Sequence, residues 1–513
     1  MQKKQTILVV ASLLVVVLSV TLAYFTAQII GKGKNVTINS ADLKIIFTDS
    51  DGAISGSNIE PGWSDTKTFT IENKSNETYK YNIVIQNLVN TFVTEGYLQY
   101  KITSTNGGYN MTEFKDVPKS SVATDTILAY SASIDVGVTQ TYTVQFIYKN
   151  DEEVDQSEDM GKKLSGKLFI TEGTIDIHAG YEEGTLGYQI MNDNPTRSTR
   201  SSNNNGTNDF ATPLTTTTTG TLFTSTESIA GSTPKEVYYY AGNTTNNWVK
   251  FANFYWRIIR TNHDSSIRLL YVGTSPDTTT GNIGESTFNA SYSSPKYVGY
   301  KYGEDTSLDT IRNNTTDSTI KAFIDSWYQK NLTNYTKYLS NAAVYCNDRI
   351  EGTGQKYSAS SEFNFAPYFR MDYDTKGAKA NPSYNCTDIR DAFSVDNTSA
   401  KLDYPVSLMT ADEMAFAGGV AYKTMNTPYA WFISNSAGTQ VSTYWWSLSP
   451  TRWNGSGALV SYWSSAVAQL YDNVVWRDFA VRPAISLKSC TLYSTGNGTA
   501  SEPYTIKETT SGC

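Results

Sequence analysis

Hydrophobic and polar residues alternate along the first third of the chain, in short runs separated by turn-forming residues. Clusters such as EPGWSD at 60–65 and STNGG at 104–108 interrupt the alternation. A period of two places successive side chains on opposite faces of a β-strand. The pattern predicts an all-β antiparallel sandwich over residues 24–180, as in immunoglobulin-like domains. The five clearest runs are KTFTIEN (67–73), KYNIVIQN (80–87), YLQYKITS (97–104), YTVQFIYK (142–149) and GKLFITE (166–172).

The N-terminus carries a different pattern, an almost unbroken apolar run from Ile7 to Ala23 that follows Lys3 and Lys4. Residues 1–23 are therefore predicted to be a signal peptide or a membrane anchor. The run is long for a signal-peptide core and borderline for a membrane span, so both outcomes stay open. The two lysines keep the N-terminus inside, which places the rest of the chain outside the membrane in either case. We expect a secreted or cell-surface protein that meets the membrane only through this segment.

The segment at 181–235 is rich in Ser, Thr, Asn and Gly and poor in apolar residues, especially over 198–228. Such a composition buries too little apolar surface to offset the entropy lost on ordering. We therefore expect a mobile linker between two domains.

Strand-like and helix-like patterns both occur in the second domain, predicted at 236–489. Apolar residues at one-face helical spacing predict a helix over 318–331, with Asp317 as its N-cap. The sequence TADEMAFAGG (410–419) has a T-x-x-E capping box at its start and two glycines at its end, which predicts a short second helix. Strands before and after these helices indicate an α+β domain rather than a wound parallel sheet. The strand-like runs are EVYYYAG (236–242), VKFANFYWRIIRTN (249–262), SIRLLYVG (266–273), TYWWSLSP (443–450) and VVWRDFAVRPAISL (474–487).

Four segments of the N-terminal part resemble the TasA/camelysin family of Firmicutes, in the same order. The resemblance implies a signal peptidase cut near the AYF element, which favours cleavage after Ala23, and a jelly-roll-like sandwich. It also implies that the chain can assemble into extracellular matrix fibres, for which Tyr24–Asn39 is either a donor strand or an ordinary first strand. The segments are AYFT (23–26), NVTINSADLKIIF (35–47), IEPGWSDTKTFTIENKSN (59–76) and DQSEDMGKKLSGKLFI (155–170).

The C-terminal part resembles a module of Firmicutes surface proteins that looks like a divergent C-type-lectin-like fold, related to formylglycine-generating enzymes. Related folds bind carbohydrates or proteins through loops. The EPN or QPD and WND elements of calcium-dependent lectins are missing, and so is a reactive cysteine pair in the late strands. Calcium-dependent sugar binding and formylglycine chemistry are therefore not carried over. The resemblance rests on WRIIR (256–260), YPVSLMTADEMAFAGG (404–419), YWWSLSP (444–450) and VRPAISL (481–487).

Composition argues against several classes of function. The net charge of -8 and pI of about 5.1 disfavour nucleic acid as a partner. The chain has two His and no HExxH motif, which argues against a His-based triad and a zinc protease. The acidic residues Asp412, Glu413, Asp472 and Asp478 have no spacing that selects a catalytic pair. Asp49 and Asp51 belong to a turn rather than a calcium loop. We expect no enzyme activity, no cofactor and no metal.

Five tryptophans lie close together between residues 445 and 476. Indole rings fill sheet cores, but they also stack on sugars and anchor protein interfaces. The core accounts for most of these rings, above all Trp445 and Trp446. The remaining three, Trp453, Trp463 and Trp476, are the candidates for ligand binding. Trp453 precedes the turn NGSG (454–457) and is expected to be the most exposed.

The chain has four cysteines, all in its C-terminal half. Four cysteines allow three pairings, and an exported location permits disulfides. Sequence proximity predicts Cys346–Cys386 and Cys490–Cys513. The second bond would staple a C-terminal tail, residues 490–513, onto the last strand.

Two functions remain after these steps. The first is an adhesin-like surface protein whose distal module binds an extracellular glycan or protein. The second is a structural subunit of a matrix fibre that self-associates through its N-terminal sandwich.

Overall fold

The computed structural model describes most of the chain, which divides after Ile177 into two compact units. The predicted leader, its cleavage after Ala23, all but two residues of Tyr24–Asn39 and the Asp49–Asp51 turn lie outside the described residues. Within the described part of the chain, no helix is long and apolar enough to cross a membrane. The described residues are 36–37, 43–47, 53–56, 59–94, 96–172, 177–202, 208–217 and 220–513.

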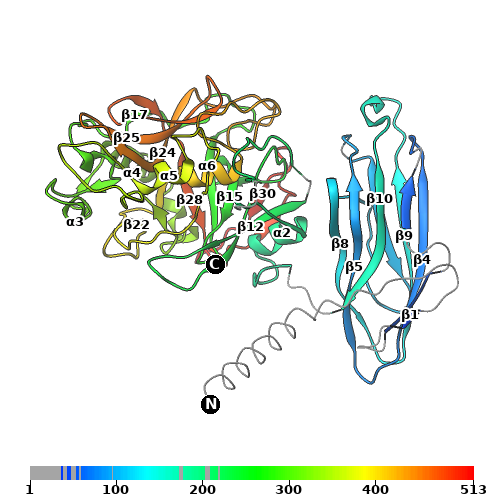
Figure 1. The fold of residues 1–513 in the computed structure, drawn as a ribbon. Helices are drawn as coiled ribbons and strands as arrows, with labels where there is room; N and C mark the ends of the chain where they lie inside the picture. The colour runs from blue at the N-terminus through cyan, green and yellow to red at the C-terminus, as the bar shows by residue number, and fades with distance from the viewer. Residues whose placement is uncertain are drawn as a thin grey trace, which may run out of the picture. The chain divides into compact units, whose positions relative to one another are not determined.

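The N-terminal unit consists of two antiparallel sheets that share one hydrophobic core (Figure 1). The first sheet has the order β1 (Val36–Thr37), β2 (Leu43–Phe47), β4 (Ser64–Asn73), β9 (Thr139–Tyr148), β6 (Leu98–Ser104) and β7 (Lys115–Asp116). The second has the order β3 (Ala53–Gly56), β10 (Leu164–Glu172), β5 (Tyr79–Asn90) and β8 (Ser120–Ile134). A 3₁₀ turn, η1 (Ser157–Asp159), precedes β10.

Alternation in the sequence explains this core. Every second residue of β9 is buried, including Tyr142, Val144 and Phe146, while their neighbours are only partly covered. The partner strand β4 alternates in the same way and buries Phe69 and Ile71. Burying one face of each sheet against the other removes these side chains from water. All five predicted strands are confirmed.

The C-terminal unit is mostly β, with a branched ten-stranded sheet at its centre. Most pairs are antiparallel, but β11–β12 and β14–β30 are parallel. The main path runs β11 (Thr196–Thr199), β12 (Thr221–Glu227), β13 (Lys235–Tyr239), β15 (Phe254–Thr261), β14 (Trp248–Phe251), β30 (Tyr504–Ile506) and β29 (Tyr493–Thr495). The branch from β15 continues through β16 (Ile267–Gly273), β28 (Pro483–Leu487) and β23 (Val406–Leu408).

A second, six-stranded sheet carries the tryptophan-rich segments (Figure 1). Its path is β17 (Glu285–Thr287), β27 (Asp478–Ala480), β24 (Tyr444–Trp453), β25 (Ala458–Ser464) and β26 (Gln469–Val474), with β21 (Phe363–Asn364) on β24. Two small sheets pair β18 (Lys301–Tyr302) with β19 (Thr316–Asp317) and β20 (Tyr345–Cys346) with β22 (Ala392–Phe393). The helices are short: α2 (Leu186–Asp193), α3 (Leu308–Ile311), α4 (Thr319–Asn331), α5 (Ala366–Met371), α6 (Ala411–Ala417) and the 3₁₀ turns η2 (Pro295–Val298) and η3 (Thr333–Tyr338).

The predicted mobile linker at 181–235 is wrong over much of its length. Leu186, Ile190 and Met191 of α2 are buried in the core of the C-terminal unit. Strands β11 and β12 then add to the edge of the large sheet. The i, i+4 and i+5 spacing of these apolar residues places them on one buried helix face. The overall composition of the segment does not reveal this spacing. The predicted tail is likewise part of this unit, because β29 and β30 extend the same sheet.

Both predicted helices are present. The capping box at Thr410 and Glu413 forms at the start of α6, as predicted. Helix α4 begins one residue later than predicted, with Ser318 rather than Asp317 as its N-cap. The carboxylate of Asp317 instead binds the buried ammonium of Lys321 at 3.1 Å.

The ammonium of Lys321 lies among three carboxylates whose arrangement resembles a metal site. Its Nζ lies 2.6 Å from Asp325 and 2.7 Å from Asp403, in addition to the contact with Asp317. The ammonium supplies the positive charge that three neighbouring carboxylates require. This cluster is therefore an ion-pair network in which partly exposed carboxylates surround one buried ammonium.

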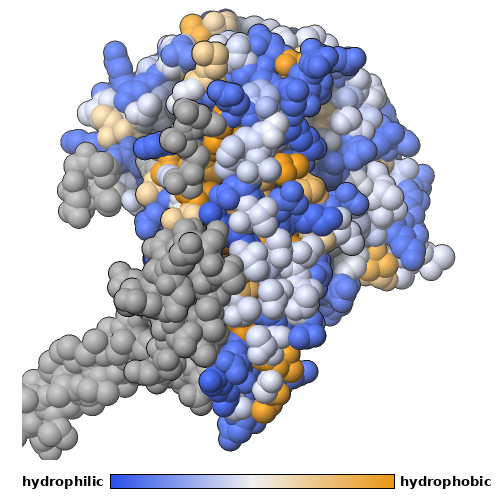
Figure 2. Space-filling view, turned by 90° about the vertical axis from the view of Figure 1, so that its right-hand side faces the viewer, coloured by the Kyte–Doolittle hydropathy of each residue, from blue (hydrophilic) through white to orange (hydrophobic). Residues whose placement is uncertain are grey.

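The surface turned to the viewer in Figure 2 is mostly hydrophilic, with hydrophobic residues in small separate groups. Among the described residues, nine large hydrophobic side chains are exposed. Scattered apolar residues of this kind are normal, and only neighbouring ones suggest a binding surface.

Candidate functional site

Of the ten tryptophans, all within the described part of the chain, seven are buried, two are partly buried and one is exposed. Trp476 is 40% exposed, and it is the single tryptophan classed as exposed. Trp445 and Trp446 are fully buried, as predicted.

The exposed ring predicted at Trp453 is not found, because the side chain is only 3% exposed. Trp453 pairs with Ala458 on one side and with Phe363 of β21 on the other, so an added strand covers the end of β24. Trp463 is also fully buried and packs against Phe432, with ring centroids 4.8 Å apart. Of the three candidate ligand-binding tryptophans, only Trp476 is on the surface.

Trp476 has an exposed aromatic neighbour, Tyr292, which is 45% exposed. The two ring centroids are 6.1 Å apart, and the ring planes are tilted by 50°. The guanidinium of Arg477 lies over the Trp476 ring, 4.3 Å from its centroid. We call Tyr292 and Trp476 the aromatic pair.

Ala458 fixes both members of the aromatic pair through its backbone. Its N–H donates to the carbonyl of Tyr292 at 2.9 Å, and its carbonyl accepts from Val475 at 3.0 Å. Val475 in turn accepts from Asn289 at 3.0 Å. The two rings therefore project from segments that are hydrogen-bonded to the first residue of β25.

The turn between β24 and β25 borders the pair. Asn454 Oδ1 accepts from the N–H of Gly457 at 2.8 Å, which closes the turn. A Cβ on Gly457 would lie 3.9 Å from the ring of Tyr292 and 3.1 Å from Val474. A side chain at this position would press on Val474, whereas the ring of Tyr292 lies at ordinary contact distance from the turn.

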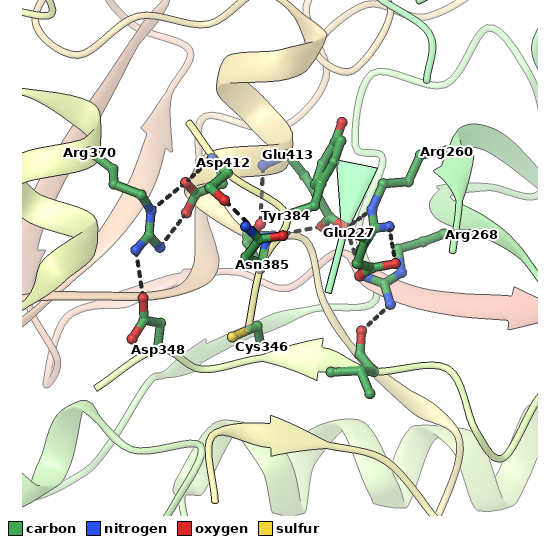
Figure 3. Close-up of a pocket in the computed structure, with 13 residues that line it drawn as sticks. Glu227, Arg260, Arg268, Cys346, Asp348, Arg370, Tyr384, Asn385, Asp412 and Glu413 are labelled. Atoms are coloured by element: carbon green, nitrogen blue, oxygen red, sulfur yellow. Dashed lines mark hydrogen bonds and ion pairs between the residues drawn. The ribbon is translucent and has the colours of Figure 1, made fainter. Parts of the chain in front are cut away.

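A cavity in the C-terminal unit is lined mainly by charged residues rather than exposed rings (Figure 3). Its free space is about 20 Å³, which is room for one water molecule and not for a sugar or peptide. The residues that line it come from β12, β15, β16, α5 and α6 and from the loops beside β20.

Buried arginines and carboxylates form paired networks around this cavity. Arg260 and Arg268 lie opposite each other on β15 and β16, an unfavourable placement for like charges. Glu413 Oε1 lies between them, 2.9 Å from Arg260 Nε and 2.6 Å from Arg268 Nη1. Glu227 adds two hydrogen bonds to Arg260, at 2.9 and 3.0 Å. Two carboxylates thus compensate two buried cations.

The other acidic residues considered for catalysis either bind arginine or lie on the surface. Asp412 binds Arg370 through two hydrogen bonds of 2.8 and 2.9 Å. Asp472 binds Arg452 at 2.9 Å, while Asp478 is an exposed residue of β27. The cavity carboxylates are bound to arginine, which favours their ionised form and suits them poorly to act as general acids.

The arginines shift the acidity of the two buried glutamates. Burial raises the pKa of Glu227, but the charge of Arg260 and the hydrogen bonds from His263 and Arg260 together outweigh this effect. Burial likewise raises the pKa of Glu413, and the charges of Arg268 and Arg260 together with the hydrogen bond from Thr410 outweigh it. Both pKa values therefore lie below the ordinary glutamate value of 4.5.

The C-terminal unit is expected to lose stability in acid because of these shifts. Folding lowers both pKa values, so the stabilisation is complete above pH 4.5 and is lost as the pH falls through the folded values. Urea unfolding followed by tryptophan fluorescence reports on this unit, since nine of the ten tryptophans lie in it. We expect the Glu227→Gln variant to be less stable at neutral pH and less sensitive to acid. An unchanged slope of stability against pH would contradict the assignment.

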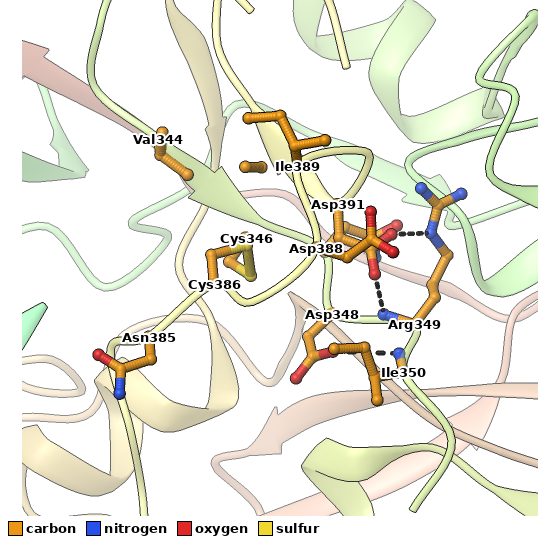
Figure 4. The surroundings of a disulfide bond; sticks show 12 residues. Val344, Cys346, Asp348, Arg349, Ile350, Asn385, Cys386, Asp388, Ile389 and Asp391 are labelled. Carbon is orange, nitrogen blue, oxygen red and sulfur yellow. Dashed lines mark hydrogen bonds and ion pairs between the residues drawn. A yellow bond between two sulfur atoms is a disulfide. The ribbon is translucent and has the colours of Figure 1, made fainter. Parts of the chain in front are cut away.

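Both predicted disulfides form. Cys346 pairs with Cys386, beside the ion pair of Arg349 and Asp391 (Figure 4). Cys490 pairs with Cys513 and holds the chain end. The first bond connects β20 to the segment around Cys386. The carbonyl of Cys386 in turn accepts a hydrogen bond of 2.7 Å from the N–H of Ala230. Disulfides of this kind are consistent with an extracellular protein.

Sequence reasoning missed two parts of these sites. Tyr292 is not among the predicted binding residues, although its setting in the polar stretch NASYSS (289–294) favours an exposed ring. Glu227 was assigned to the linker, so its pairing with Arg260 was not expected. The partner cations are separated from it along the chain, and only the sheet brings them together.

Comparison with known proteins gives little further information. Neither a protein-family model nor a curated protein matches this chain. A solved structure of a ruminal GH26 endo-β-1,4-mannanase is similar at 11% sequence identity and a TM-score of 0.15. The match covers 30% of this chain and 31% of the mannanase chain, and a likeness this weak carries no argument.

Proposed function

We propose that this chain is an exported bacterial surface protein whose C-terminal unit binds an extracellular glycan or protein. The aromatic pair is the observation that carries the proposal. A folded protein buries most of its large aromatic rings, and this unit buries most of its tryptophans. Two neighbouring exposed rings, held by backbone hydrogen bonds, are a ready anchor for a ligand.

The remaining features support this assignment. The apolar leader directs the chain out of the cell, and the disulfides suit the oxidising exterior. The motif order supports a TasA/camelysin-like jelly-roll for the N-terminal unit and a divergent C-type-lectin-like fold for the C-terminal unit. On this proposal the N-terminal sandwich presents the binding unit at the cell surface.

A matrix-fibre subunit is the second candidate, and one observation favours it. Strand β8 is the end strand of its sheet in the described part of the chain, and it is fifteen residues long. A long strand at the end of a sheet is a common place for another chain to add a strand. Sedimentation of purified residues 24–513 as filaments would support this function, and a stable monomer would count against it.

Binding is expected to depend on the aromatic pair. Labelled residues 24–513 would be added to intact producer cells and to a mucin-coated surface, and retention would be measured after washing. The Tyr292→Ala, Trp476→Ala double variant should lose at least about fivefold in retention, since two anchor rings are removed. Tyr444→Ala is the matched control, because Tyr444 is an aromatic residue of the same unit that is 36% exposed but lies outside the pair. Equal retention of all three proteins would contradict the proposed function.

A further inference from the structure

The geometry points to a neutral polysaccharide chain as the ligand of the aromatic pair, bound by stacking of its sugar rings on Tyr292 and Trp476. This inference rests on the proposed function and narrows its ligand to one class. Three observations carry it: the size of the apolar surface, the arrangement of the rings and the charge around them.

The apolar surface of the pair is small. Of the nine exposed large hydrophobic side chains among the described residues, Tyr292 and Trp476 are in ring contact with each other. Tyr444, in contrast, packs on the buried rings of Tyr462 and Phe479. A stable protein interface buries about 800 Å² on each partner, with several anchors around a centre. Two isolated rings match the size of two consecutive sugar units instead.

The rings are arranged to receive one flexible chain. Arg477 occupies one face of the Trp476 indole at 4.3 Å, so a ligand approaches the opposite face. The 50° tilt between the two ring planes excludes a flat surface such as crystalline polysaccharide. A single glycan chain can place one sugar on each tilted ring, because neighbouring pyranose rings rotate about the glycosidic bond. The apolar C–H face of each sugar then lies on an aromatic ring by dispersion contact.

The residues next to the rings in the chain and in the bordering turn are polar, and they include one cation and one anion. Arg477 and the adjacent Asp478 are both exposed and have opposite signs. Ser291, Ser293 and Ser456 are exposed hydroxyl residues beside the rings in sequence or in the bordering turn. Hydroxyl and amide groups can exchange hydrogen bonds with sugar hydroxyls. An acidic glycan would meet the carboxylate of Asp478 as well as the cation of Arg477, so a neutral one fits better.

Isothermal titration calorimetry of residues 24–513 tests this inference. The probes are cellohexaose, mannohexaose, xylohexaose and chitohexaose, with hexagalacturonate as the acidic comparison. We expect saturable binding of at least one neutral hexasaccharide, no change on adding EDTA, and weaker or no binding of hexagalacturonate. Trp476→Ala should raise the Kd about tenfold and Trp476→Phe less, while Tyr444→Ala should stay within about twofold. Failure of all four neutral probes, or equal weakening by Tyr444→Ala, would overturn the inference.

Cell binding separates this inference from the proposed function. Periodate oxidation of the cells should abolish retention if a glycan is the ligand, whereas protease treatment should not. Retention that survives periodate and disappears after protease would overturn the glycan inference and leave a protein-binding function. Absence of any retention that depends on the aromatic pair would overturn both.

Discussion

Replacing Glu413 with alanine is expected to lower the free energy of unfolding of the C-terminal unit by about 3–5 kcal/mol. The substitution removes the carboxylate that lies between Arg260 and Arg268, two arginines that are at most 3% exposed. It leaves like charges facing each other in a dry environment, where burial of an uncompensated cation is expensive. It also removes the cap bond at 2.9 Å from the N–H of Thr410 to the second carboxylate oxygen.

Urea unfolding followed by tryptophan fluorescence measures this effect. Glu508→Ala is the matched control, because that glutamate is exposed and its removal should change stability by less than about 0.5 kcal/mol. Glu413→Gln keeps the side-chain shape and an acceptor for Thr410, so it should fall between the parent and the alanine variant. A loss below about 1 kcal/mol for Glu413→Ala would show that the buried ion pairs do not stabilise the fold.

Loss of the Cys346–Cys386 disulfide is expected to destabilise the same unit by about 4 kcal/mol in the chain-entropy model. The two cysteines are 40 residues apart, so the bond restricts a long loop in the unfolded chain. The Cys346→Ser, Cys386→Ser double variant would be compared with the parent in oxidising buffer. Cys386 is fully buried, so a new hydroxyl there adds to the loss.

The second disulfide provides the comparison. Cys490 and Cys513 are 23 residues apart, and the same model gives about 3 kcal/mol for their removal. This bond holds β30 and the buried Tyr504 against β14, so its loss should first release the C-terminal segment. Limited proteolysis would then cut near the C-terminus before the rest of the unit unfolds. Equal resistance of both double variants and the parent would contradict this account of the disulfides.

The local elements of the fold were largely predictable, because their causes are local. Period-two alternation indicated strands such as β9, and the T-x-x-E pattern indicated the start of α6. The disulfide pairs followed from proximity along the chain. None of these predictions needed contacts between distant segments.

The parts that failed depend on such contacts. Trp453 was expected on the surface because a polar turn follows it, but β21, ninety residues earlier in the chain, covers it. The segment at 181–235 reads as a linker by composition, yet α2 buries three apolar side chains against the C-terminal core. Tyr292 and Trp476 meet because Ala458 hydrogen-bonds to Tyr292 and to Val475, the neighbour of Trp476, and no local pattern encodes that meeting. Whether a strand adds beside Trp453 depends on contacts between distant segments. The sequence therefore predicts the most exposed ring at Trp453, whereas the structure exposes Trp476.

Oxidative footprinting with mass spectrometry tests the central claim most directly. Residues 24–513 would be labelled by hydroxyl radicals in free solution and while retained on intact producer cells. Trp476 and Tyr292 should label strongly in the free protein and become protected on the cells, while Tyr444 should label equally in both states. Unchanged labelling of the two rings on retained protein would show that the chain binds through another surface and would contradict the assignment.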